Sequence, residues 1–128
     1  MSYTHDRTIT DASIDAVDAR IRKALSEQGF GVLTEIDVKA TLKAKIGTEV
    51  DDYRILGACS PAMAYKAIQV EPRVGAMLPC NVILRAVKGG VEISAIDPVA
   101  SMQAIDNKDL QRIADEVRQM LVEAVEAA

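Results

Sequence analysis

Aromatic side chains are scarce in this chain, which has no Trp, one Phe and three Tyr among its 128 residues. Proteins that bind single-stranded nucleic acids stack bases on aromatic rings, so the scarcity argues against that class of function. An excess of basic residues is absent as well, since the formal net charge is −4. A surface that follows a phosphate backbone needs clustered Lys and Arg, and we therefore expect no nucleic-acid partner.

Long apolar runs are also missing. No stretch approaches the roughly 20 apolar residues that cross a bilayer, so we expect no membrane partner. The opening sequence MSYTHDRTITD lacks the basic start and apolar run of a secretory signal peptide. Cys59 and Cys80 are the only cysteines, too few for the disulfide framework of a small secreted domain. Together these absences favour a protein of the reducing cytoplasm.

Aliphatic residues are plentiful. The hydrophobic fraction is 49%, which supplies a core of Val, Ile, Leu, Ala and Met. A chain of this length has the usual size of one domain and removes roughly two thirds of its unfolded surface from water on folding. No repeat, low-complexity tract or linker divides it. We expect residues 1–128 to form a single domain.

Helical periodicity is clearest near the two ends of the chain. The first apolar stripe follows Thr10 or Asp11 as a cap and stops at Gly29; its members are Ile14, Val17, Ile21 and Leu25. The last helix is predicted over about residues 107–126 with Asp106 as its cap. Its apolar face contains Leu110, Ile113, Val117, Met120, Leu121 and Val125. Two shorter helices are predicted between them, over 38–46 after Asp37 and over 61–70 after Ser60.

Strand patterns occupy most of the remaining chain. The predicted strands cover residues 3–9, 30–37, 52–58, 74–78, 80–87 and 91–97. Lys88-Gly89-Gly90 predicts a tight turn between the last two. Strand and helix do not alternate regularly enough for a doubly wound parallel sheet. The pattern predicts an α+β fold in which an antiparallel sheet carries two main helices on one face.

The predicted strand 80–87 carries apolar side chains in both of its alternating sets. Val82 and Leu84 belong to one set, and Ile83 and Val87 to the other. Because successive side chains of a strand point to opposite faces of the sheet, the face without helices is not fully exposed to water. We therefore expect a homodimer that buries part of this second face.

Four separated segments resemble, in the right order, the signature runs of one family. They are FGVLTEIDVKATLKAKI at 30–46, YRILGACSP at 53–61, EPRVGAMLPCNVILR at 71–85 and ISAIDP at 93–98. The chain thus resembles the uncharacterised bacterial family known as domain of unknown function 302. The resemblance implies a β-α-β(4)-α arrangement related to the TATA-binding-protein-like fold, with short helical insertions, and a tendency to dimerise. It implies no activity and no DNA binding, because function belongs to sites and not to folds.

The two cysteines are the first candidates for a functional site. Cys59 ends a predicted strand just before the helix start at Ser60, and Cys80 begins a strand after Pro79. Because both lie at strand ends, they could face each other across one edge of the sheet. A thiol at a helix N-terminus can have a lowered pKa, and two thiols can form a redox couple. Alternatively, both are small apolar core residues, since their spacing fits no CxxC redox or zinc motif.

Asn81 completes the candidate binding set, which is Cys59, Ser60, Pro79, Cys80 and Asn81. Asn81 either hydrogen-bonds a ligand or holds the bend that begins at Pro79. In the resembled family Asn often stands at the position of Ser60, so no side-chain amide is required there. The free backbone N–H groups at the start of helix 61–70 are a potential anion site.

Other polar residues give weaker signals. His5, the only histidine, could join the two cysteines in a zinc site, but no local spacing supports one. Lys39 and Lys43 share one face of the predicted helix 38–46, which either attracts an anion or is simply solvated.

No motif assembles an acid, a base and a nucleophile, so no catalytic residue, metal ligand or cofactor is indicated. The sequence favours a non-enzymatic dimeric module of unknown function that binds a small molecule or a protein partner around Cys59 and Cys80. The alternative, from a different class, is a thiol-dependent redox or sulfur-handling protein that uses the same two cysteines.

Overall fold

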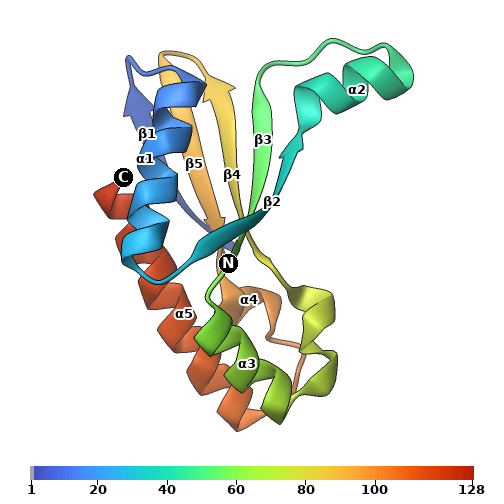
Figure 1. Cartoon of the computed structure of the whole chain (residues 1–128), viewed down its shortest axis with the longest axis vertical. Coiled ribbons are helices and arrows are strands. Elements are labelled where there is room, and N and C mark those ends of the chain that lie inside the picture. Colours follow the sequence, from blue (N-terminus) through green and yellow to red (C-terminus); the bar gives the residue numbers. More distant parts are fainter. Residues whose placement is uncertain (1) are drawn as a thin grey trace.

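A computed structural model describes residues 2–128 and shows a twisted antiparallel sheet with helices on one side and at one end (Figure 1). The strands are β1 (Thr4–Thr10), β2 (Gly31–Asp37), β3 (Tyr53–Cys59), β4 (Cys80–Val87) and β5 (Gly90–Ile96). The helices are α1 (Ile14–Glu27), α2 (Val38–Ile46), α3 (Pro61–Val70), η1 (Pro72–Met77), α4 (Pro98–Ser101) and α5 (Lys108–Ala127). The five strands lie in the order β1-β5-β4-β3-β2. Without the short helices the chain reads β-α-β(4)-α, which confirms the expected α+β fold.

Helices α1 and α5 pack against one face of the sheet and against each other (Figure 1). The stripe predicted for α1 is confirmed, because Val17, Ile21 and Leu25 are completely buried. They meet the inward-facing set of the central strands, of which Leu84 and Ile93 are also completely buried. Burial of each such side chain contributes roughly 1.5–3 kcal/mol, so this aliphatic layer provides most of the driving force for folding.

The helix caps differ from the expected ones by one to three residues. Ser13, and not Thr10 or Asp11, caps α1 through a 3.1 Å hydrogen bond from the Ala16 N–H. Asp11 instead adopts a left-handed conformation, with φ of 53°, in the turn that follows β1. Likewise Asn107, and not Asp106, caps α5. A capping oxygen must reach the N–H two or three residues ahead, so the final register of the helix decides between neighbouring polar residues.

The strand predicted over residues 74–78 is wrong. Residues 72–77 form the 3₁₀ helix η1, whose Val74 N–H donates to the Glu71 carbonyl at 3.0 Å. Pro72 fixes a helical φ at the first position, and Val74 becomes completely buried under this turn. The apolar pattern thus reflects burial on one side of a turn. The chain then passes through a cis peptide bond between Leu78 and Pro79 and enters β4.

The segment β2–α2 projects from the side of the sheet (Figure 1). As predicted, Asp37 caps α2 through a 2.9 Å bond from the Ala40 N–H, and Gly47 ends it in a left-handed conformation. However, α2 contains no buried residue, and every residue of β2 except the half-buried Val32 is exposed. This arm is therefore held to the body by its strand pairing and by ion pairs, with little apolar packing of its own.

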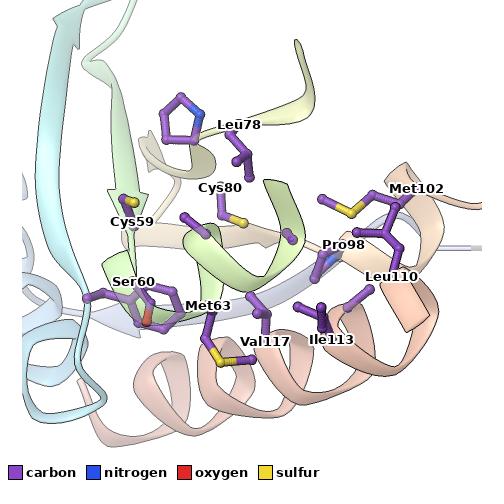
Figure 2. A pocket seen from close by; sticks show the side chains of 16 residues that line it. Cys59, Ser60, Met63, Leu78, Cys80, Pro98, Met102, Leu110, Ile113 and Val117 are labelled. Carbon is purple, nitrogen blue, oxygen red and sulfur yellow. The ribbon is translucent and has the colours of Figure 1, made fainter. Parts of the chain in front are cut away.

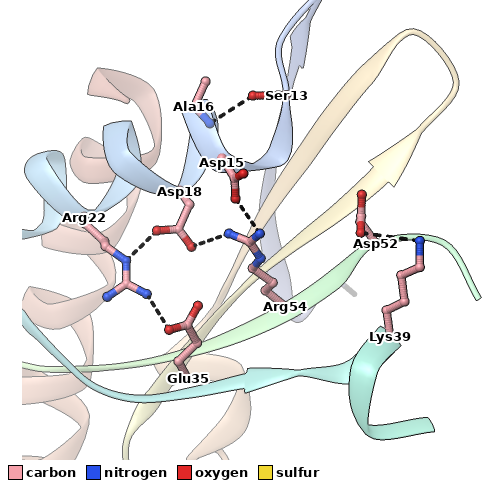
Figure 3. Close-up of polar contacts among 9 residues, drawn as sticks. All are labelled: Ser13, Asp15, Ala16, Asp18, Arg22, Glu35, Lys39, Asp52 and Arg54. Carbon is pink, nitrogen blue, oxygen red and sulfur yellow. Dashed lines mark hydrogen bonds and ion pairs between the residues drawn. The ribbon is translucent and has the colours of Figure 1, made fainter. Parts of the chain in front are cut away.

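A chain of ion pairs joins α1 to β3 and β2 at the base of the arm (Figure 3). Arg54 of β3 contacts Asp15 at 2.6 Å and Asp18 at 3.2 Å, both on α1. The hydrogen bond with Asp15 is the main cause that raises the pKa of Arg54. Asp18 also accepts from Arg22 at 2.5 Å, and Arg22 reaches Glu35 of β2 at 3.3 Å. The buried Asp18 carboxylate is thereby paired on both oxygens, as a buried charge requires.

Gly57 of β3 occupies a point of close approach on the open face of the sheet. A Cβ atom at this position would collide with the side chains of Thr34 on β2 and of Pro79. We expect Gly57→Ala to lower the free energy of unfolding by about 1–3 kcal/mol, because a short, stiff side chain and a proline ring must both move. Urea denaturation measures this change. Gly31→Ala is the control, because its Cβ would enter open space. Equal stability of the two variants would contradict the assignment.

Candidate functional site

A narrow cavity lies where β3 ends and β4 begins, between α3, α4 and α5 (Figure 2). Its volume is about 30 Å³, enough for roughly two water molecules. The walls are apolar and mostly small, and include Ala58, Ala64, Ala67, Ala114, Met63 and Met102. Such a space favours an apolar guest over ordered water, because water needs two to four polar partners.

The cavity lies at the seam between two hydrophobic clusters. Ala58, Met63 and Val117 belong to the large cluster under the sheet. Ala67 and Ala114 belong to a smaller cluster beyond the end of the sheet, under α3 and η1. The alanines of α3 and α5 let the two helices approach, but their short side chains do not fill the space between the clusters. The sequence signal for this seam was limited to Ala64 and Ala67, three residues apart on α3.

The two cysteines are neighbours in the sheet and both line the cavity. As predicted, Cys59 ends β3 and Cys80 begins β4. They do not pair directly, because the partner of Cys80 is Ala58 and the partner of Cys59 is Gly31. In Figure 2 the sulfur of Cys80 points away from Cys59. The two cysteines thus lie close together on neighbouring strands, but their side chains do not face each other.

Burial raises the pKa of the Cys80 thiol to about 11, and the nearby Cys59 adds a smaller effect in the same direction. Cys80 is therefore a neutral thiol at physiological pH. Since the thiolate is the reactive form of cysteine, Cys80 lacks the property that a redox or nucleophilic thiol needs. A redox role would have to begin at the more exposed Cys59.

Ser60 precedes α3 and is 8% exposed. Its carbonyl accepts the Ala64 N–H at 2.9 Å, as an N-cap carbonyl does. Its hydroxyl, however, makes no capping hydrogen bond, and the residue lines the cavity. Because Pro61 has no N–H, the first free donors of α3 are the N–H groups of Ala62 and Met63, and of these two residues only Met63 lines the cavity. The residues Ser60 and Met63 thus bring polar groups to one end of the cavity.

Four of the five predicted site residues line this cavity, namely Cys59, Ser60, Pro79 and Cys80. Asn81 does not: it is exposed, pairs with Gly57 and lies in the hollow of the open face of the sheet with Tyr53 and Ile83. Asn81 is adjacent to Cys80 in the chain, so the alternation of side chains along β4 directs it to the opposite face.

The other polar candidates lie elsewhere. His5 of β1 forms a 2.8 Å contact with Glu126 of α5, away from the cysteines. Within residues 2–128, no group of His, Cys, Asp or Glu is arranged to hold a metal ion. Lys39 pairs with Asp52 and Lys43 with Glu49, which agrees with a solvated helix face.

Comparisons with known proteins show the family and the fold of this chain. The family model for the domain of unknown function DUF302 matches residues 5–128. The chain belongs to this family, as its four signature runs indicated. A crystal structure of an uncharacterized conserved DUF302 protein from Bacillus stearothermophilus has a TM-score of 0.92 at 22% identity, covering 99% of this chain and 98% of that one. At this identity the likeness shows the fold. No curated protein matches the chain.

Among residues 2–128, no helix is both long enough and apolar enough to cross a membrane.

Thiol labelling separates the two cysteines. We expect iodoacetamide to modify Cys59 first in the native protein at neutral pH, because Cys80 is buried and its pKa is raised to about 11. As the pH rises towards that value, labelling of Cys80 accelerates by about tenfold per pH unit, in step with its thiolate fraction. Intact-mass measurements on Cys59→Ser and Cys80→Ser follow each site alone. Rapid native labelling of Cys59→Ser would show that Cys80 is reactive and would revive the redox alternative.

Proposed function

We propose that this protein is a homodimeric, non-enzymatic module that binds a small apolar molecule in the cavity at the start of α3. The observation that carries the proposal is the cavity itself, an apolar space that ends at the unpartnered Ser60 hydroxyl. Ligand sites in proteins combine apolar walls with a few polar groups that fix the orientation of the ligand. The cytoplasm of a bacterium is the proposed location, which the two free cysteines support.

The small volume is compatible with binding because two of the walls are methionines. Met63 of α3 and Met102 after α4 are 7% and 6% exposed. The thioether side chain has several rotatable bonds and is polarisable, so methionine fits its shape to different neighbours. A ligand larger than the present 30 Å³ would be accommodated by rotation of these two side chains, with no change in the sheet.

The raised pKa of Cys80 supports binding over thiol chemistry. A neutral, buried thiol behaves as a small apolar group with a weak S–H donor. In this proposal Cys80 forms part of the cavity wall, and Pro79 and Cys59 form its rim.

Filling the cavity tests the proposal. Ala67 of α3 and Ala24 of α1 are both 4% exposed, but of the two only Ala67 lines the cavity. We expect Ala67→Val to abolish binding of a small apolar probe, n-pentane, followed by NMR shifts of the backbone amides. Ala24→Val should retain binding but lower the free energy of unfolding by about 1–3 kcal/mol through overpacking, whereas Ala67→Val costs less because it enters free space. If wild-type protein showed no shifts with n-pentane, the binding function would be refuted.

The homodimer part of the proposal rests on the open face of the sheet. Ile36, Ile55 and Ile83 are register partners on β2, β3 and β4 and form an apolar row across this face. Ile36 is 46% exposed, and the other two are half-buried. The projecting α2, which buries no residue, begins two residues after Ile36 of this row. A second copy that covers the row would bury surface that the α1 and α5 layer leaves exposed to water.

A charge placed on this row tests the dimer. We expect Ile83→Lys to shift the protein towards a monomer in analytical ultracentrifugation, because an ammonium group in the interface would be desolvated without a partner. Ile68→Lys makes the same change at an isoleucine that is 45% exposed on α3, a helix beyond the end of the sheet (Figure 1). We expect the Ile68→Lys variant to remain a dimer. A wild-type protein that sediments as a monomer at micromolar concentration would remove this part of the proposal.

A further inference from the structure

The free polar groups of the cavity are hydrogen-bond donors. Ser60 is more than nine-tenths buried and lines the cavity, and its hydroxyl has no capping partner. Because no fully buried side-chain nitrogen or oxygen in residues 2–128 lacks a partner, this hydroxyl oxygen keeps some accessible surface. The N–H of Met63, which also lines the cavity, has no intrahelical acceptor at the start of a helix, whereas Ala62 is exposed and lies outside the lining. Together these groups can receive one acceptor atom of a bound molecule.

The same cavity is unfavourable for an anion. Among the described residues that line it, none is Asp, Glu, Lys, Arg or His. Its effect on a negative charge is visible at Cys80, whose pKa is raised to about 11 chiefly by burial. A carboxylate in this space would lose its hydration without gaining an ion pair, and the field of one helix end compensates only part of that loss. A neutral oxygen can accept hydrogen bonds from the same donors, and its burial costs far less hydration than that of a carboxylate.

We infer that the ligand is an uncharged short-chain molecule with one hydrogen-bond acceptor, such as a small ketone or aldehyde, whose oxygen lies at Ser60. This inference rests on the proposed function and specifies the chemical class of the ligand. The chain of the ligand lies among the alanines and methionines, and its oxygen accepts from the Ser60 hydroxyl and the Met63 N–H. The arrangement selects neutral carbonyl compounds against carboxylates of the same length.

Three probes of similar size separate the contributions of apolar packing, of a neutral hydrogen-bond acceptor and of a negative charge to binding. The full-length protein is titrated with n-pentane, 2-butanone and butanoate, with affinities taken from amide NMR shifts. We expect 2-butanone to bind at least about tenfold more tightly than butanoate, because the buried anion has no counter-ion. Ser60→Ala should lower the affinity for 2-butanone by about threefold to tenfold, the usual net effect of one hydrogen bond. The same substitution should change the affinity for n-pentane by less than about twofold, because that probe accepts no hydrogen bond.

Two controls keep the comparison specific. Ser60→Ala removes no capping hydrogen bond, and its unchanged binding of n-pentane shows that the cavity is intact. Ser94→Ala removes another buried serine, 5% exposed on β5 and outside this cavity, and should leave all three affinities unchanged.

The outcomes distinguish the inference from the proposed function. Failure of both n-pentane and 2-butanone to bind would overturn both. Binding of n-pentane together with butanoate as tight as 2-butanone would overturn the inference alone. The inference would also fail if Ser60→Ala weakened n-pentane and 2-butanone equally, since Ser60 would then shape the cavity without recognising an oxygen.

Discussion

The whole structure depends on the packing of α5 against two different surfaces. A helix of 20 residues extends about 30 Å, whereas the strands contain seven or eight residues each. Its C-terminal half, with Leu121 and Val125, packs under the sheet beside α1. Its N-terminal half, with Leu110 and Ala114, extends past the sheet and must be covered by α3, η1 and α4. The helical insertions of the chain therefore complete the burial of one long apolar face.

The helices cover one face of the sheet and leave the other open. An antiparallel sheet tolerates this arrangement when its second face is polar, and β1 and β5 satisfy that condition with Asp6, Thr8 and Glu92. Strands β2 to β4 do not, because isoleucines occupy their open side. The isoleucine row lies among polar residues such as Asn81 and Arg85 of β4 on this face, and the row distinguishes the surface available to a second copy from the surface exposed to water.

Much of the fold could be predicted from sequence because its elements are set by local patterns. Ser60-Pro61 placed the start of α3, and the four-residue stripe from Ile14 placed the core face of α1. The strand predicted at 74–78 failed because burial of Val74 from one side looks the same in a turn as in a strand. Of the candidate site, the residues next to the strand ends could be predicted. The far wall, with Met102 and Ala114, could not, because it is assembled from helices distant in the chain.

The seam between the two hydrophobic clusters also divides the molecule into units of unequal cooperativity. Native proteins open in contiguous parts whose free energies range from near zero to that of global unfolding. The smaller cluster, which contains Val74 and Leu110, is formed by helical segments, so we expect it to loosen while the sheet and α1 remain folded. Such partial opening would expose the interior at the seam without breaking any ladder hydrogen bond. A space that is too narrow in the closed structure thereby gains a route of exchange with solvent on the timescale of local unfolding.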